Sequence, residues 1–519
     1  MTSLESLIGL LLAAVVLTAL ARRAGAPYPA FLALGGAGLA FVPGVPIFRI
    51  EPDLALALFV APVLLDAAYD ASPRDLKRNW AALTGLVIVA VIVTTVVVAY
   101  VARLLVPSMP WAIALALGAV VAPPDAAAAI AVLRHVRPPH RILTILEGES
   151  LLNDATALMI YRLAVGVAVT RSFSIGDVAP AFAVAVIGSI IIGPALAWLF
   201  LRLTRNVEDV PSAIVLQFVG TFGIWILAEH LRLSAVLTVV CFAIAVARRA
   251  PESTPARIRI PSYAVWDTVV FVMNVLAFVL IGLQIRPILA SLEPGVRSQY
   301  FTVAAAVLAT VILVRIAWVF GYVGVARAIN RLRGYGPRRP MLPPTYKGAA
   351  VVGWCGMRGI VTLAAALALP AGLDAGAVHF RDLIVLTAFS VVLGTLVVQG
   401  LTLKAVLRAV NIRDDDPVGR ETGLARERAL RAVLASVEGD SSPAAEAVRQ
   451  EYTRHLKSAR EGRVDRALAG SADAQVRRRA LAAARDVVLK LREEDEIGDD
   501  AFHRIEEELD RLELGLEEN

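Results

Sequence analysis

Residues 81–106 read AALTGLVIVAVIVTTVVVAYVARLLV, an apolar run in which Arg103 is the single charged residue. At about 1.5 Å per residue, a helix of this length covers roughly 39 Å, more than the roughly 30 Å of hydrocarbon in a bilayer. The run therefore predicts a helix that crosses a membrane.

The whole chain has the composition of a membrane protein. Of its 519 residues, 57% are hydrophobic and 18% are charged, and its mean hydropathy is +0.68. Soluble domains usually carry about 25% charged residues. The two cysteines, Cys241 and Cys355, lie in apolar runs, so neither a disulfide framework nor a cysteine metal site is expected. The basic residues lie mainly in loops between apolar runs, which indicates topology and not a nucleic-acid partner.

Apolar runs long enough to span a bilayer recur about thirteen times before residue 410. The first run lacks a basic leading region and a small-residue cleavage site, so we expect an uncleaved span. The predicted fold is an all-α, polytopic bundle. Its spans are placed at residues 4–21, 29–42, 52–71, 81–106, 111–133, 142–168, 179–203, 212–231, 234–248, 263–283, 300–327, 347–369 and 381–407.

The loops predict the orientation of the bundle. Alternate loops carry about twenty Lys and Arg on one side against roughly seven on the other, and basic loops face the cytoplasm. The N-terminus is then outside. From residue 411 the composition changes to Arg, Glu, Asp and Ala, with apolar residues at helical spacing. We therefore divide the chain into a transmembrane domain, residues 1–410, and a cytoplasmic helical tail, residues 411–519.

Ionisable residues deep in apolar spans point to an interior site, because burying them in lipid is costly. Five such residues are predicted well inside the bundle: Asp66, Asp125, Asp154, Arg315 and Arg358.

Two of the predicted spans carry helix-breaking residues beside these charges. Pro123 and Pro124 precede Asp125 in the fifth span, and glycines surround Arg358 in the twelfth. Unwound segments at corresponding positions of two halves are a sequence sign of a transporter site near the midplane. The two spans are each fifth in a unit of six, which predicts an inverted repeat with two broken, crossing helices. The glycines are Gly353, Gly356 and Gly359.

The sixth span contains the richest polar cluster, EGESLLND at residues 147–154. Ser150 and Asp154 are four residues apart, so a hydroxyl and a carboxylate share one helix face. Hard cations prefer oxygen ligands, which this face, the amide of Asn153 and Asp125 can supply. Burial also raises the proton affinity of an aspartate, so a cation and a proton can compete for Asp154. Such competition gives exchange without ATP.

Other charged positions have structural interpretations as well. Asp66 is equally consistent with a helix-end hydrogen bond and with a role in the site. Arg358 is expected to compensate the helix ends at the break. Glu149 and Arg315 are hypothesised to form a buried pair, because a lone charge at that depth is costly.

Five segments of the chain resemble the monovalent cation/proton antiporter family, in its electroneutral branch of bacterial sodium/proton antiporters and animal sodium/proton exchangers. The resemblance covers roughly residues 1–410. The segments are APVLLD at 61–66, APPDA at 122–126, EGESLLND at 147–154, FVLIGLQ at 278–284 and GWCGMRG at 353–359.

The resemblance implies a thirteen-span inverted repeat, a homodimer and an elevator-like movement of the ion-carrying core. It makes Asp154 the carrier of Na⁺ or H⁺, with Asn153 beside it and with Ser150 and Asp125 helping to hold the ion. An Asn-Asp pair accompanies electroneutral exchange in this family. Two positions depart from the family pattern: Asp66 stands for the usual Glu, and Pro124 for the usual Thr.

The leading prediction is a secondary antiporter that exchanges Na⁺ or Li⁺ for H⁺ across the cell (inner) membrane and contributes to pH homeostasis. Potassium/proton exchange is the near alternative, and a proton-coupled solute symporter is another. Ser150 as the nucleophile of an intramembrane enzyme is disfavoured, because no His lies within a span beside it. No cofactor is expected, and the partners are the cation, protons, membrane lipid and a second copy of the chain.

Overall fold

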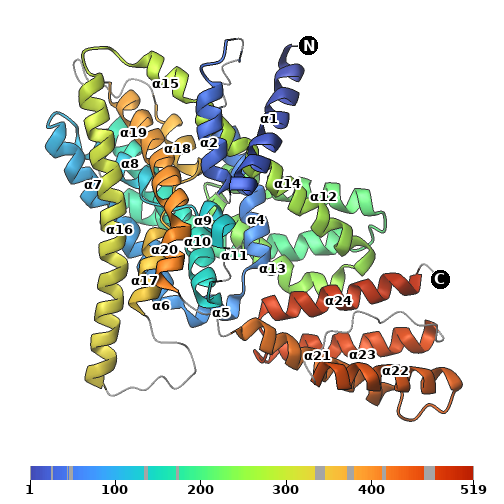
Figure 1. The fold of residues 1–519 in the computed structure, drawn as a ribbon. Coiled ribbons are helices and arrows are strands. Elements are labelled where there is room, and N and C mark those ends of the chain that lie inside the picture. Colours follow the sequence, from blue (N-terminus) through green and yellow to red (C-terminus); the bar gives the residue numbers. More distant parts are fainter. Residues whose placement is uncertain are drawn as a thin grey trace.

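The computed structural model describes residues 2–24, 27–43, 45, 51–133, 138–170, 175–333, 345–370, 379–411, 416–460 and 474–517. Across these ranges the chain is helical, and none of them contains a strand. The predicted all-α bundle is confirmed (Figure 1).

The described residues of the first half of the membrane part form ten α-helices. Two π-helical turns join some of them into longer helices: Leu56–Val60 links α3 to α4, and Gly85–Ala90 links α6 to α7. The helices are α1 (Thr2–Ala24), α2 (Tyr28–Leu39), α3 (Pro52–Ala55), α4 (Ala61–Asp70), α5 (Pro73–Arg78), α6 (Trp80–Thr84), α7 (Val91–Leu105), α8 (Trp111–Val121), α9 (Ala126–Leu133) and α10 (His140–Thr170).

Where the structure describes the second half, it continues with ten more α-helices, and the π-helical turn Leu396–Gly400 links the last two. The tenth predicted span begins earlier than expected, because Pro255 starts a helix at Ala256. The helices are α11 (Ile175–Thr204), α12 (Val210–His230), α13 (Ala235–Ser253), α14 (Ala256–Leu283), α15 (Ile285–Ser291), α16 (Arg297–Arg333), α17 (Tyr346–Trp354), α18 (Ile360–Leu367), α19 (Phe380–Thr395) and α20 (Leu401–Val410).

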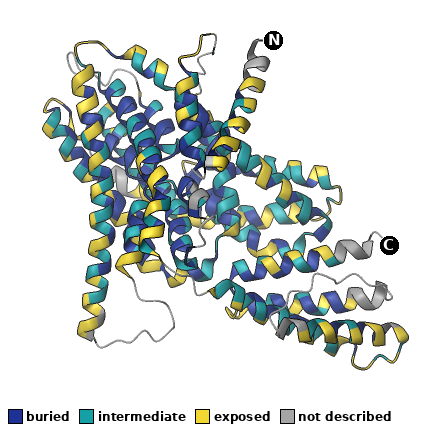
Figure 2. Ribbon diagram, viewed as in Figure 1, coloured by how far each residue is buried: buried dark blue, intermediate teal, exposed yellow. Residues whose placement is uncertain are grey.

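Within the described residues, eight helices are long and apolar enough to cross a membrane, and shorter apolar helices such as α2 and α8 accompany them. Their burial separates central helices from peripheral ones. In the most apolar window of Phe380–Val410, 72% of the residues are buried, against 17% for Pro180–Thr204. Helix α19 and the π-helical turn that follows it therefore occupy the interior of the bundle, whereas many residues of α11 are exposed (Figure 2).

The C-terminal part forms a separate helical bundle beyond the end of α20. It consists of α21 (Pro417–Ser436), α22 (Pro443–Arg460), α23 (Ala474–Glu493) and α24 (Asp499–Glu517). All four helices contribute apolar side chains to a core of its own, which includes Ala425, Val448, Val488 and Phe502. In Figure 1 this bundle lies in red beside one end of the transmembrane helices, with α24 nearest to them.

Candidate functional site

Two interrupted helices meet inside the bundle, as the sequence predicts. Helix α8 ends at Val121 and α9 begins at Ala126, while α17 ends at Trp354 and α18 begins at Ile360. Helix ends leave backbone N–H and C=O groups without partners inside their own helix. Here the two breaks satisfy one another directly, because the N–H of Asp125 donates to the carbonyl oxygen of Met357 over 2.7 Å.

Asp125 stands at the start of α9 and packs against the other break. Gly359 is buried there, and a Cβ at that position would collide with the Asp125 carboxylate. Only a residue without a side chain allows this close approach. The adjacent N–H of Ala126 donates to the Ser150 hydroxyl of α10 over 3.3 Å. Asp125 is thus held between α18 and α10.

The polar cluster of α10 lies against the same break. Asn153 is fully buried, and its Nδ2 donates to the carbonyl oxygen of Pro124 over 2.7 Å. The Asn153 Oδ1 atom is buried and has no hydrogen-bond partner, so this oxygen can accept a hydrogen bond or coordinate a cation. Asp154 is partly exposed and lies within electrostatic range of Asp125. The structure therefore brings Ser150, Asn153 and Asp125 to one region of the bundle. Asp154 lies on α10, as Ser150 and Asn153 do.

Asp66 lies on a different wall. It is partly buried on α4 and lines a cavity of about 380 Å³ bounded by α4, α11, α12, α13, α14 and the tail helix α24. The lining of that cavity includes none of the other four candidate ion-binding residues. Asp66 lies inside α4 and not at its end, so it does not cap that helix. Its role in the ion site stays a prediction.

Arg358 compensates carbonyl groups at both breaks. Its guanidinium is buried and donates to the carbonyl oxygens of Val121 at 3.1 Å and Ala122 at 3.2 Å, where α8 ends. It also donates to the carbonyl oxygen of Gly356 in its own break. A cation stabilises the negative end of a helix dipole. The electrostatic role of Arg358 stays a prediction from the sequence.

Glu149 and Arg315 form the hypothesised buried pair. Two parallel hydrogen bonds join the guanidinium to the carboxylate, at 2.5 and 2.9 Å, and both side chains are at most 5% exposed. Arg315 also donates twice to the Val352 carbonyl oxygen in α17, at 3.2 and 3.0 Å. The pair thereby fixes α10 to α16 and α17 one helical turn before Asn153.

One residue of the site, Thr395, was not predicted from the sequence. Thr395 of α19 is fully buried, and its hydroxyl accepts from the backbone N–H of Arg358 over 3.0 Å. A hydroxyl at this point satisfies a donor freed by the break in the twelfth span. The run also contains Thr387, Ser390 and Thr402, so the sequence did not single out Thr395.

A helical bundle with two facing broken helices, and with a carboxylate, a hydroxyl and an amide gathered at the breaks, has the architecture of a membrane transporter of the broken-helix class. The chain belongs to the sodium/hydrogen exchanger family, because the family model for the transmembrane sodium/hydrogen exchanger matches residues 10–409. It is thus a multi-pass membrane protein of a secondary-transporter family.

The curated relatives agree with this family. An uncharacterised Na⁺/H⁺ exchanger of Mycobacterium tuberculosis is 31% identical, covering 98% of this chain and 95% of that protein. The sodium, potassium, lithium and rubidium/H⁺ antiporter of Bacillus subtilis is 27% identical over 93% of this chain and 73% of its own length. The low-affinity Na⁺/H⁺ antiporter NhaS1 of Synechocystis is 30% identical over 83% and 79%.

The fold agrees with a solved antiporter. The sodium proton antiporter MjNhaP1 of Methanocaldococcus jannaschii matches with a TM-score of 0.59 at 18% identity, covering 79% of this chain and 99% of that one. At that identity the match concerns the fold alone. It supports the arrangement of the bundle described above.

Proposed function

We propose that this chain exchanges Na⁺ or Li⁺ for H⁺ at Asp154, with Ser150, Asn153 and Asp125 completing the cation site. The observation that carries the proposal is the convergence of oxygen atoms at the break between α8 and α9. The Ser150 hydroxyl, the unpartnered Asn153 Oδ1 and the Asp125 carboxylate gather there. Oxygen ligands of this kind suit a small hard cation.

Exchange follows from the chemistry of one carboxylate. A protonated Asp154 is neutral and has no charge with which to hold Na⁺, whereas an ionised Asp154 attracts Na⁺ in a region of low dielectric. Each ion therefore leaves before the other binds. Carriage of the two ions in opposite directions then requires that the site opens to one side of the membrane at a time.

The neutral partner of Asp154 supports electroneutral turnover. Asn153 occupies the neighbouring position and donates to Pro124, so it contributes no charge of its own. One carboxylate then carries either one Na⁺ or one H⁺, and the two half-cycles move equal charge. Arg358, Glu149 and Arg315 serve as electrostatic and structural supports in this scheme.

Sodium stands first because the family and the relatives named above are sodium/proton exchangers. The relative whose name includes potassium also includes sodium, so exchange restricted to K⁺ is not favoured. The location in the cell membrane, the external N-terminus, the cytoplasmic tail, the role in pH homeostasis and the homodimer belong to this proposal. They rest on the distribution of basic loops and on the family resemblance.

Reconstitution into liposomes that contain a pH-sensitive dye tests the proposal. Addition of Na⁺ or Li⁺ should change the internal pH, and Asp154→Asn should abolish that change while the protein remains folded. Asp209→Asn is the matched control, because Asp209 caps α12 at the surface and Asn caps helices equally well. A response in Asp154→Asn equal to that of the wild type contradicts the assigned carrier. A turnover rate that follows a valinomycin-imposed potential contradicts electroneutral exchange.

A further inference from the structure

The tail bundle is anchored on the α13 and α14 part of the membrane domain. Arg259 of α14 forms a double hydrogen bond with Asp510 of α24, through Nε at 3.0 Å and through Nη2. These side chains are 4% and 0% exposed, so the contact is buried. Arg492 of α23 also donates to the Ala247 carbonyl oxygen of α13, at 3.5 and 3.4 Å. These contacts hold α24 against the membrane helices.

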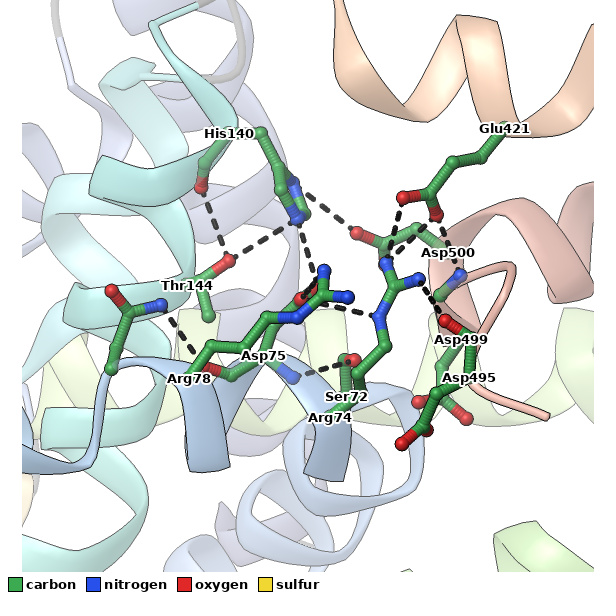
Figure 3. A network of polar contacts seen from close by, with 12 residues as sticks. Ser72, Arg74, Asp75, Arg78, His140, Thr144, Glu421, Asp495, Asp499 and Asp500 are labelled. Carbon is green, nitrogen blue, oxygen red and sulfur yellow. Dashed lines mark hydrogen bonds and ion pairs between the residues drawn. The ribbon is translucent and has the colours of Figure 1, made fainter. Parts of the chain in front are cut away.

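The same α24 also reaches the helix that carries Asp154. His140 is the first residue of α10, and Asp154 follows fourteen positions later on that helix. The Nδ1 atom of His140 lies 3.3 Å from Asp500 of α24, and its Nε2 atom lies 3.2 Å from Asp75 of α5 (Figure 3). The imidazole therefore stands between a carboxylate of the tail and a carboxylate of the membrane domain.

Several other groups face this cluster and define its charge. The Thr144 hydroxyl of α10 lies 3.4 Å from His140 Nε2. Arg74 in turn is held by Glu421 of α21, through oxygens at 2.9 and 2.8 Å. The charged or titratable neighbours of the cluster are Arg74 and Arg78 of α5, Glu147 of α10, and Asp499 and His503 of α24.

The number of protons on His140 decides how many of its contacts are favourable. A neutral imidazole has one N–H, so it donates to one carboxylate and turns a lone pair toward the other. A protonated imidazole has two N–H groups and donates to both, and each bond is assisted by charge. Protonation of His140 thus strengthens the bridge from Asp75 to Asp500, and deprotonation breaks one side of it.

The side that breaks is the contact with the tail. Asp75 retains Arg74 at 3.4 Å and Arg78 at 3.6 Å. Burial opposes the ionisation of Asp75, but His140 and Arg74 hold its pKa below the usual value. Burial raises the pKa of Asp500, although the charges of His140 and His503 act in the opposite direction. The Asp500 side chain is 43% exposed, against 12% for Asp75. Water therefore competes more strongly for Asp500 than for Asp75, and the remaining proton of a neutral His140 stays with Asp75.

We infer that His140 is a pH-operated tether between the tail and the transport helix α10: when protonated it holds α10 to α24, and when neutral it releases α10. This inference rests on the proposed function, in which the helix carrying Asp154 has to move relative to its surroundings during each cycle. Because α24 is anchored on α13 and α14, a tethered α10 moves less readily. A low pH on the side of the tail should therefore slow the maximal turnover.

Kinetics in vesicles whose tails face outward test this tether, since the external buffer then sets the pH at His140. At saturating Na⁺, the wild-type maximal rate should fall roughly three- to tenfold between external pH 8 and pH 6. Competition between H⁺ and Na⁺ at Asp154 is a separate effect, because it changes the Na⁺ concentration for half-maximal rate. His140→Gln cannot be protonated and should keep its maximal rate within about twofold over the same range.

Two further variants sharpen the kinetic test. Asp500→Asn removes the carboxylate on the tail and should reproduce most of the effect of His140→Gln. His455→Gln is the matched control, because His455 lies in the tail on α22 and contacts Tyr452. It should retain the wild-type pH profile. An unchanged pH profile in His140→Gln, or in Asp500→Asn, overturns the tether.

Hydrogen exchange provides a readout that does not depend on transport. After correction for intrinsic rates, peptides from α24 and from the start of α10 should exchange about three- to tenfold faster at pH 8 than at pH 6. This difference should be largely lost at the start of α10, and reduced in α24, in His140→Gln and Asp500→Asn. Equal protection at both pH values in the wild type overturns the tether. If exchange follows the prediction but Na⁺ drives no pH change in any vesicle, the proposed function fails and the pH-dependent contact stands.

Discussion

The Nε atom of Arg358 donates to the carbonyl oxygen of Val121, the last residue of α8, over 3.1 Å. Arg358 belongs to the break in the second half of the chain, and Val121 to the break in the first. The two halves therefore stabilise each other's unwound segments, with a cation placed at the negative end of a helix. Without this contact, buried carbonyl groups would lack a partner.

Replacement of Arg358 should destabilise the whole bundle. Arg358→Met leaves the carbonyl groups at the break unsatisfied, and we expect a loss of about 2–4 kcal/mol in the free energy of unfolding. Arg358→Lys keeps the charge but not the fork of donors, so its loss should be smaller. Thermal denaturation in detergent measures both. Arg511→Met is the control, since Arg511 forms an exposed pair with Glu507 and should change little.

The pair of Glu149 and Arg315 should show strong coupling in a double-mutant cycle. Glu149→Leu alone and Arg315→Met alone each leave a buried charge without its partner, which typically costs about 3–5 kcal/mol. The double variant removes both charges and should be less destabilised than either single variant. Denaturation midpoints of the four proteins give the coupling. Additive losses would show that the two side chains do not act as a pair.

Glycine at 359 should be essential for the site and glycine at 353 should not. A methyl group at 359 would collide with the Asp125 carboxylate, whereas at 353 the nearest atom, the Cα of Ile316, is 3.6 Å away. Gly359→Ala should therefore displace Asp125 and raise the Na⁺ concentration for half-maximal rate by about tenfold or more. Gly353→Ala should stay within about twofold. Equal effects of the two variants would show that Asp125 does not take part in cation binding.

The sequence predicted the bundle and its breaks because both depend on local features. Long apolar runs specify spans, and Pro123 and Pro124 specify an interruption wherever the surrounding helices lie. The pair of Glu149 and Arg315 was also predictable, because a buried charge demands a partner and few were available at that depth.

The rest of the site depends on distances between segments remote in sequence. Thr395 serves Arg358 only because α19 packs beside the break, and the sequence offers no register between them. The contact of His140 with Asp500 joins residues 360 positions apart, one beside a basic loop and the other in the charged helical tail. No periodicity encodes such a contact, so the tail was recognisable as a helical unit but not as a partner of α10.

The docking of the tail should also depend on His503. Its ring is stacked on Tyr69 of α4 with centroids 6.0 Å apart. Burial opposes its protonation, but the hydrogen bond to Glu506 and the charge of Asp70 raise its pKa above the ordinary value. A raised pKa stabilises the docked state below the ordinary pKa, and this contribution is lost as the pH rises through the higher value.

Docking should therefore weaken above neutral pH, and His503→Gln should reduce that dependence. We expect a difference of a few degrees in the melting of the tail between pH 6 and pH 8 in the wild type, and a smaller one in the variant. The fluorescence of a label on the tail, recorded during thermal melting, measures this difference. His455→Gln again serves as control, and a variant with the full wild-type difference would exclude His503.

The charge carried per cycle should change when Asn153 becomes acidic. Asn153→Asp places a second carboxylate beside Asp154 and removes the amide that donates to Pro124. We expect both carboxylates to titrate, so that two protons exchange for one Na⁺ and one net charge crosses the membrane in each cycle. Turnover should then follow a valinomycin-imposed potential, unlike the wild type. Asn153→Ser is the control, because it loses the amide without adding charge and should stay insensitive to potential. Insensitivity in Asn153→Asp would mean that this position faces away from the transported ions.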